Sequence, residues 1–315
     1  MAKAIKASDK QAVWRKVSTA LKKRYKDTAP KESRPVLETL LYAACLENTT
    51  HDVAETTYEA VLGKFFDLNE IRVSSITELS VAMGDAPDAE RRGFWVRSIL
   101  QYVFESNYEY QFEKVRRKTL ELAARHLGRI PNITPFIRLH TLQQTMAAFV
   151  TPIDDKMNAA ATWLGFIEPG TNNEDAADAM KSAVKKADAA GMIHLLRMLA
   201  NDPALQVAFE DAAAAELDEE FDLMSASTRL NALFKSPPKR KKVVKKKAAK
   251  KEAPAKTTTK KKPAKKAAPA KKAAKKAATK KKVVKKKPVK KQAATKKKTA
   301  KKAPAKKKKA AKKKR

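Results

Sequence analysis

The stretch VLETLLYAAC, residues 36–45, decides the fold class of this 315-residue chain. Its apolar side chains recur three and four residues apart, which is the spacing of one helix face, and they do not alternate strictly with polar residues. The same spacing continues through the body of the chain, and all seven glycines occur before residue 192. The sequence therefore predicts an all-α fold.

Helix start signals repeat along the chain. Ser75 followed by Glu78 has the pattern of a capping box. Thr134 followed by Pro135 is typical of an N-cap and a first-turn proline, and Asn173, before two acids, is expected to open a further helix. The predicted helices span residues 9–26, 34–47, 51–66, 75–83, 88–106, 108–127, 135–149, 154–164, 173–189, 191–200, 203–215 and 218–233.

Charge divides the chain into three parts. Residues 236–315 hold 40 Lys+Arg and one acid, a net charge of +39, whereas residues 1–235 hold 30 bases and 33 acids. The first 34 residues are also basic, with 11 bases and three acids. We predict a basic amphipathic N-terminal helix (1–34), an all-helical body (35–235) large enough to bury a core, and a Lys/Ala/Pro-rich tail (236–315) that is disordered on its own.

The composition excludes several classes of protein. A single cysteine, Cys45, excludes an internal disulfide, a cysteine-ligated zinc site and a four-cysteine iron–sulfur cluster. No run of about 18 apolar residues exists, so no membrane span is expected, and the N-terminus lacks the apolar stretch of a secretory signal. There is no His-x-x-x-His pair and no phosphate-cradling glycine loop. We expect an intracellular protein with no metal, no cofactor and no small-molecule substrate.

The tail carries the strongest functional signal. Its lysine clusters are separated by Ala, Pro, Thr and Val, and without aromatic residues it has no platform for stacking bases. Duplex DNA carries one charge per ~1.7 Å, so the +39 charge of the tail matches the phosphates of about 20 base pairs. We therefore predict sequence-independent binding to the phosphates of double-stranded DNA, with RNA as a competing polyanion.

The tail is similar to the C-terminal domain of linker histones and to the lysine-rich tails of bacterial histone-like proteins. Its segment KKVVKKKAAKK, from Lys241, is nearly repeated as KKVVKKKPVKK, from Lys281. The candidate phosphate-binding residues of the tail are Lys239, Arg240, Lys241, Lys242, Lys245, Lys246, Lys247, Lys281, Lys282, Lys285, Lys286 and Lys287.

Other charged segments of residues 1–235 have more than one possible role. The N-terminal bases interleave with Val13, Trp14, Val17 and Leu21, so this helix either docks its apolar face on the body or also contacts phosphate. The acidic stretch 210–222 is either a solvated face or a partner for the basic tail. Two basic clusters would form a duplex platform if both faced one cleft: Arg91, Arg92 and Arg97, and Arg116, Arg117 and Lys118.

Three short segments of the body are informative in combination. They are LENTTHD (46–52), which follows a leucine-rich helix, then GRIP (128–131), and then PIDDKM (152–157), which leads into Leu164-Gly165. In this order they resemble the endonuclease III branch of the helix-hairpin-helix DNA glycosylases, over about residues 35–167. The resemblance implies an all-α fold of two helical lobes around a cleft.

Asp154 matches by position the catalytic aspartate of that family. The resemblance implies that it stabilises positive charge at the sugar, or activates the attacking group, once the base is flipped out of the stack. The alternative is that Asp154 only caps the helix that runs to Gly165. Asn48 or Thr49 stands where the family often carries a glutamine that fills the gap left by the flipped base.

The sequence also departs from the family pattern. The DNA-binding hairpin of the family needs a Gly-x-Gly turn, but no glycine lies between Gly128 and Gly165. The lysine just after that hairpin is the lyase nucleophile, and no lysine occurs between Lys118 and Lys156. The cysteines that bind the iron–sulfur cluster of the family are absent beyond residue 167. These departures argue against lyase activity.

The favoured interpretation is a chromosome-associated protein that binds DNA without sequence preference, through a histone-like tail, and whose glycosylase-like body is catalytically degenerate. The first alternative is an active base-excision-repair glycosylase that its tail tethers to DNA. The second alternative is an RNA- or ribosome-associated factor, because the tail would bind any polyanion. The expected compartment is the nucleoid or the nucleus.

Overall fold

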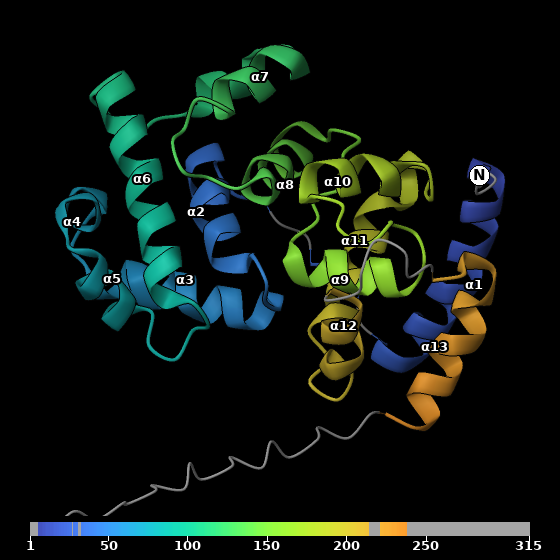
Figure 1. Cartoon of the computed structure of the whole chain (residues 1–315). Coiled ribbons are helices and arrows are strands. Elements are labelled where there is room, and N and C mark those ends of the chain that lie inside the picture. Colours follow the sequence, from blue (N-terminus) through green and yellow to red (C-terminus); the bar gives the residue numbers. More distant parts are fainter. Residues whose placement is uncertain (1–5, 27, 31–32, 214–220, 238–315) are drawn as a thin grey trace, which may run out of the picture. The chain divides into compact units, whose positions relative to one another are not determined.

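The computed structural model describes residues 6–26, 28–30, 33–213 and 221–237, with only the backbone described at 211–213. Within these ranges every regular element is a helix, which confirms the predicted all-α fold (Figure 1). The α-helices are α1 (Ala7–Tyr25), α2 (Val36–Leu46), α3 (His51–Lys64), α4 (Leu68–Val73), α5 (Ile76–Ala82), α6 (Ala89–Asn107), α7 (Leu120–Leu127), α8 (Pro135–Met146), α9 (Asp155–Trp163), α10 (Asn173–Lys181), α11 (Ala189–Ala200), α12 (Gln206–Ala213) and α13 (Ala226–Lys235). The 3-10 helices are η1 (Glu113–Arg117), η2 (Lys186–Asp188) and η3 (Leu223–Ser225).

Capping side chains begin several helices where the sequence predicts them. Ser75 and Glu78 each accept a hydrogen bond from the other residue's backbone N–H, which confirms the capping box of α5. Thr134 caps α8, with Pro135 in its first turn. Helix α10 begins at Asn173, as predicted, and the preceding residue, Asn172, is its N-cap.

Some predicted helices are shorter or interrupted. The predicted helix 108–127 is wrong, because Tyr108 adopts the left-handed conformation (φ 55°) and ends α6, and Thr119 caps α7 further on. The predicted helix 173–189 ends already at Lys181. The six-residue helix α4, which Asp67 caps, lies outside the predicted set. The predicted helix 218–233 begins outside the described residues.

Buried apolar side chains form two clusters. The first gathers around α2 and takes in residues from α3 to Val150, just after α8. The second joins α1 to helices α9 to α13. Ten of the 11 residues of α2 are buried, so this helix is apolar all round and lies inside its cluster. Truncating one of its buried leucines, such as Leu40, to alanine is expected to cost about 2–5 kcal/mol.

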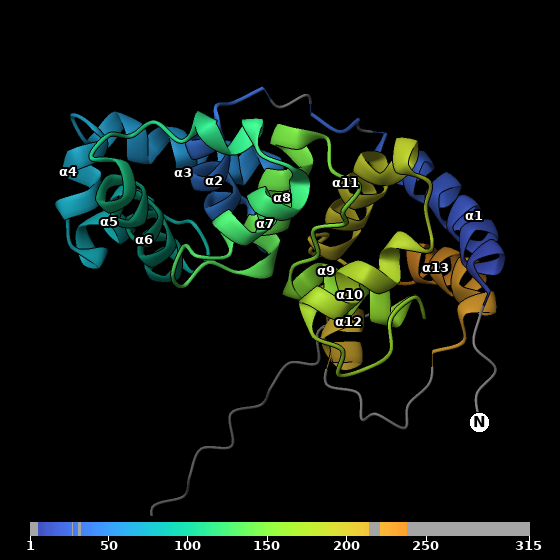
Figure 2. The ribbon, with the colours of Figure 1, turned by 90° about the horizontal axis from the view of Figure 1, so that it is seen from above.

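The basic N-terminal helix docks on the second cluster. Val13, Trp14, Val17 and Leu21 of α1 are buried, and the Trp14 ring meets Phe166 edge to face at 5.8 Å between centroids. The helix lies side by side with α13 in both views of the ribbon (Figures 1 and 2). The predicted docking of its apolar face is therefore confirmed.

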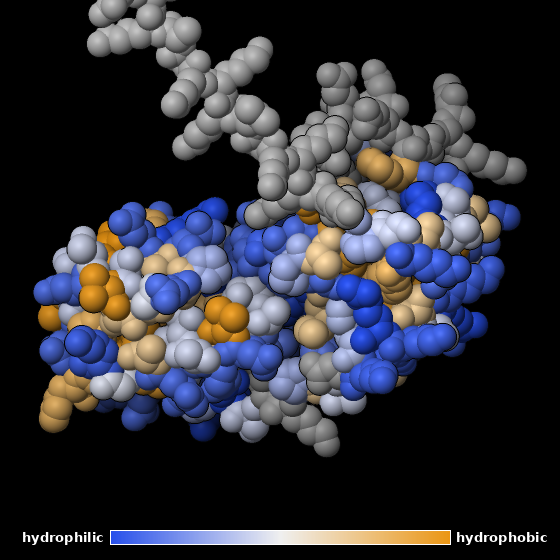
Figure 3. All heavy atoms as spheres, turned by 90° about the horizontal axis from the view of Figure 1, so that it is seen from below, coloured by the Kyte–Doolittle hydropathy of each residue, from blue (hydrophilic) through white to orange (hydrophobic). Residues whose placement is uncertain are grey.

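Exposed apolar side chains are scattered over the described surface. Phe66 and Tyr108 are 95% and 80% exposed, and one face of the molecule shows isolated apolar groups among polar ones (Figure 3). Scattered groups of this kind are normal on folded proteins. In the described part of the chain, no helix has both the length and the apolar character that a membrane crossing requires.

Candidate functional site

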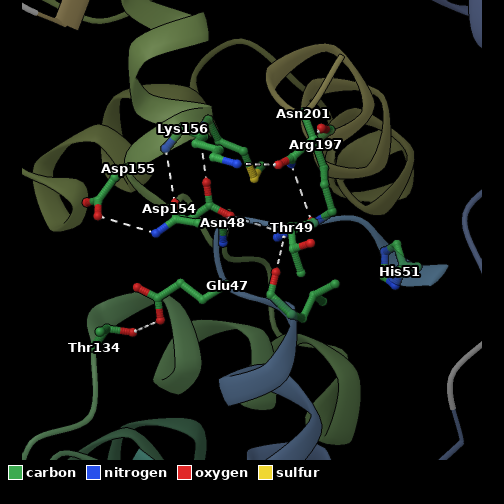
Figure 4. A network of polar contacts seen from close by, with 12 residues as sticks. Glu47, Asn48, Thr49, His51, Thr134, Asp154, Asp155, Lys156, Arg197 and Asn201 are labelled. Atoms are coloured by element: carbon green, nitrogen blue, oxygen red, sulfur yellow. Dashed lines mark hydrogen bonds and ion pairs between the residues drawn. The ribbon is translucent and has the colours of Figure 1, made fainter. Parts of the chain in front are cut away.

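Asp154 lies at the N-cap of α9 and is 0% exposed (Figure 4). Its Oδ1 accepts the backbone N–H of Met157 at 2.9 Å, which satisfies one of the free donors in the first turn of the helix. Its Oδ2 faces the turn between α2 and α3, where it accepts the backbone N–H of Asn48 at 3.1 Å. The predicted capping role of Asp154 is therefore confirmed.

Arg197, on α11, supplies the charge opposite Asp154. Its Nη1 donates to Asp154 Oδ2 at 3.1 Å and to the carbonyl oxygens of Leu46 and Thr49 at 2.8 and 2.9 Å. The side chain is 1% exposed, and its guanidinium lies 4.9 Å from the ring centroid of Phe136. Arg197 thus ties the end of α2 to the start of α9 in an interior with almost no solvent.

Asn48 completes the junction from the other side. It adopts a left-handed backbone conformation (φ 58°), which asparagine tolerates better than most residues. Its Oδ1 accepts the backbone N–H of Lys156 at 3.2 Å, and its Nδ2 donates to Asp155 Oδ2 at 3.4 Å. The Asn48 side chain, one of two candidates for the gap-filling position, is bonded to the first turn of α9.

This arrangement holds the Asp154 carboxylate in place by three donors. Two are backbone N–H groups and the third is the Arg197 guanidinium. The three donors fix the orientation of the carboxylate, and it has no exposed surface to offer a substrate. For Asp154 to act in catalysis, its carboxylate would have to give up some of these hydrogen bonds and become accessible to a substrate.

Glu47 is a second buried carboxyl at this junction. The side chain is 2% exposed, and its Oε2 accepts a hydrogen bond from Thr134 Oγ1 at 2.6 Å. Burial raises the pKa of Glu47 to about 8, and the carboxylates of Asp154 and Asp155 add to the rise. Sequence reasoning missed this residue, although a glutamate directly after the apolar run of residues 40–46 is a visible signal.

A small pocket lies next to the junction, between α9 and α12. Its volume is about 220 Å³, and Asp155 and Lys156 form part of its lining, with Phe209 and Glu210 from α12. Lys156 Nζ donates to Asn201 Oδ1 at 3.1 Å, so the ammonium group is held at the pocket wall. The pocket is smaller than the ~300–1,000 Å³ typical of small-molecule sites.

The basic clusters of the body divide between surface and interior. Arg116 and Arg117 of η1 are exposed, and Lys118, half-buried, lies with its Nζ 2.6 Å from His126 Nδ1. Arg92 is buried and donates to the carbonyl oxygens of Pro87, Ala44, Cys45 and Glu47. Arg92 therefore does not belong to the duplex platform that the two clusters would form if both faced one cleft, because its donors are used inside the protein.

The segment that precedes Asp154 contains one helix and a loop. Between Pro131 and Ile153 the chain forms one helix, α8, followed by a non-helical stretch from residue 147 to Asp154. Helix α8 packs against the preceding helix α7, and residues 128–134 join the two, with Asn132 in a left-handed conformation (φ 64°). Two consecutive packed helices are therefore present in this part of the chain, so the predicted absence of a helical hairpin is not confirmed, although the turn contains no Gly-x-Gly pair. The candidate residues of the tail, from Lys239 to Lys287, lie outside the described part of the chain.

Comparisons with known proteins find similarity only among solved structures. No protein-family model matches the chain, and no curated protein does. Matching structures include a trapped endonuclease III–DNA covalent intermediate, at 12% identity and a TM-score of 0.47 over 60% of this chain and 85% of that one. A non-covalent endonuclease III–DNA complex matches at 12% and 0.46 over 60% and 85%, and a thermostable thymine-DNA glycosylase at 11% and 0.42 over 61% and 85%. All three TM-scores lie below 0.5.

Proposed function

We propose that this chain is a chromosome-associated protein that binds double-stranded DNA without sequence preference, and that it acts in the nucleoid or the nucleus. The observation that carries the proposal is the charge of residues 236–315, where 40 Lys+Arg stand against a single acid. Such a segment binds phosphates by releasing condensed counterions. Its lysines are point charges without the fork geometry of arginine, so it reads no base sequence.

We further propose that the body does not remove bases. Asp154, the candidate catalytic residue, is bonded to Met157, Asn48 and Arg197 and has no exposed surface. No lysine occupies the residues between Lys118 and Lys156, where the resemblance would require a lyase nucleophile. The body then acts as a rigid support from which the tail reaches DNA.

An active DNA glycosylase is the alternative function. The pocket beside Asp155 and Lys156 favours it, since it lies one residue from Asp154 and contains both a carboxylate and an ammonium group. A base-excision enzyme would use the tail to stay on DNA while it searches. The two functions differ in one observable, the loss of a base.

The test compares three proteins: the full chain, the chain ending at Lys235, and the full-length Asp154→Asn variant. Each is incubated with labelled duplexes that carry uracil, an oxidised pyrimidine, an alkylated purine or an abasic site. Binding is measured by titration at several salt concentrations, and base loss by strand cleavage after alkali. We expect removal of residues 236–315 to weaken binding to every duplex by at least about 10³-fold, because the remaining residues carry a net negative charge.

We expect no base loss from any duplex with the full chain. Base loss that disappears in Asp154→Asn would establish the glycosylase instead. Undiminished binding by the shortened protein would contradict the role of the tail. A preference of the full chain for structured RNA over a duplex of equal charge would favour an RNA-associated factor.

A further inference from the structure

The outer face of α1 gathers positive charge opposite its buried side. Arg15, Lys16, Lys22 and Lys23 are all exposed, whereas Val13, Trp14, Val17 and Leu21 are buried. At 100° per residue the four bases fall on one side of the helix and the four apolar residues on the other. Arg15 and Lys22, like Lys16 and Lys23, are seven residues apart and so stand about 10 Å apart along the axis.

These four bases are free of acidic partners within the described residues. The α1 sequence contains one acid, Asp9, in its first turn. Arg24 is different, because its Nε and Nη2 donate to Asp202 Oδ2 at 3.0 and 2.7 Å. The charge of Arg24 is therefore paired with an acid of the same chain. The positive charge of the outer face is therefore available to a ligand.

The bases of α1 are also set apart from the rest of the body. Residues 1–34 carry 11 bases and three acids, and residues 35–235 carry 19 bases and 30 acids. A folded part with an acidic majority thus concentrates its excess positive charge in one N-terminal segment. A polyanion that approaches the folded part meets attraction at this face and net repulsion elsewhere.

The C-terminal end of α1 lies close to the C-terminal end of α13, the last described helix before the tail. The guanidinium of Arg24, near the end of α1, lies 4.7 Å from the ring centroid of Phe234, near the end of α13. Both helices therefore end in the same region, with exposed Lys26 after α1 and exposed Lys235 closing α13. Lys239 follows four residues after Lys235, which is at most about 14 Å of extended chain.

We propose that Arg15, Lys16, Lys22 and Lys23 form a fixed binding surface for the phosphates of duplex DNA. This inference rests on the proposed DNA-binding function and adds a site on the folded part. The four side chains are held by a docked helix, so they meet phosphates at set spacings. The tail holds the same duplex through contacts that shift along it. A rigid contact of this kind fixes the orientation of the body relative to the duplex.

The first experiment maps lysine reactivity in the full-length protein. Brief acetylation with acetic anhydride is carried out with and without a 40-base-pair duplex, and the modified peptides are quantified by mass spectrometry. We expect Lys16, Lys22 and Lys23 to lose at least about fivefold in reactivity on DNA. Exposed Lys64, at the end of α3, serves as the reference and should not change.

In the same samples, the reactivity of the tail lysines distinguishes a failure of the proposed α1 surface from a failure of the proposed DNA-binding function. Protection of the tail with unchanged reactivity in α1 would overturn the proposed surface while the DNA-binding function stands. Unchanged reactivity in both would contradict the DNA-binding function as well.

A charge-matched pair of variants tests whether the contact is fixed. Lys22→Glu/Lys23→Glu and Lys281→Glu/Lys282→Glu change the net charge equally in the full-length chain. We expect the α1 pair to weaken duplex binding about tenfold and the tail pair about twofold, because the tail can shift to other lysines and α1 cannot. Equal losses, with the helical circular dichroism of both variants intact, would overturn the proposal.

Discussion

Two arginine–aspartate pairs join distant parts of the chain, and they differ mainly in burial. Arg197 and Asp154 are 1% and 0% exposed, whereas Arg24 and Asp202 are 32% and 11% exposed. The exposed pair has the shorter contact, 2.7 Å against 3.1 Å. The length of the contact therefore does not decide which pair contributes more to the stability of the fold.

The difference shows what burial does to the same chemical pair. Removing Arg24 returns Asp202 to a partly solvated position, where Tyr25 still donates a hydrogen bond to it at 3.0 Å. Removing Arg197 leaves a carboxylate in the interior with its two backbone donors and without its ion-pair partner. The desolvation cost of an unpaired buried charge is large, and that of an exposed charge is small.

The largest effect is expected from Arg197→Met. This change keeps the length of the side chain but removes the charge opposite Asp154 and the donor to the carbonyl groups of Leu46 and Thr49. We expect the free energy of unfolding to fall by about 3–5 kcal/mol. Urea denaturation followed by circular dichroism measures it, from the midpoint and slope of the transition.

The double variant Arg197→Met/Asp154→Asn is the matched control. Asparagine caps a helix about as well as aspartate, so this variant removes the unpaired charge and keeps the cap. We expect it to recover about 1–2 kcal/mol of the loss. A double variant less stable than Arg197→Met would show that the buried charge is not the cause.

Glu47 tests how dry the interior around Asp154 is. The pKa of its carboxyl, raised by burial to about 8, lies above that of a solvated glutamate, about 4.3. Between these values the folded protein holds a proton that the unfolded chain has released. Its contribution to stability is therefore complete below about pH 4 and is lost as the pH rises through about 8.

We expect Glu47→Gln to remove this part of the pH dependence. The amide is always neutral and its oxygen can still accept the hydrogen bond of Thr134. At pH 5 the two proteins should be about equally stable, and at pH 8 the variant should be more stable, by on the order of 2–3 kcal/mol. Urea denaturation at pH 5, 6.5 and 8 measures the difference, and parallel curves for the two proteins would contradict the raised pKa.

The smallest effect is expected from Arg24→Gln, at the exposed pair. The change removes the ion pair with Asp202 and the contact with the Phe234 ring. We expect a loss of about 0.5–1 kcal/mol in 50 mM salt and less in 500 mM salt, because ions screen a partly exposed pair. Urea denaturation at the two salt concentrations measures it. A loss as large as that of Arg197→Met would remove the contrast between the pairs.

The sequence predicted those features of the fold that depend on neighbouring residues. Ser75 with Glu78, and Thr134 with Pro135, are local patterns, and each begins a helix where expected. The end of α6 was predicted to within one residue, but the chain was expected to resume a helix at residue 108, where Tyr108 is instead left-handed and the next α-helix begins only at Leu120.

The candidate site shows the same limit at longer range. Asp154 as a helix cap follows from its sequence position, but its partner Arg197 lies 43 residues further on. Arg92 and its neighbour Arg91 are alike in sequence, yet only Arg92 is buried, because its donors meet carbonyl groups at the end of α2. Which arginine turns inward is decided by the packing of helices that one sequence window does not contain.

The end of α2 has a consequence for how the molecule unfolds. Arg92, from α6, binds the carbonyl groups of Ala44 and Glu47, and Arg197, from α11, binds that of Leu46. Arg92 lies among the residues of the first hydrophobic cluster and Arg197 among those of the second. Separating the two clusters would therefore remove the Arg197 donor from the buried carbonyl group of Leu46. We therefore expect the two clusters to unfold together, in one cooperative transition.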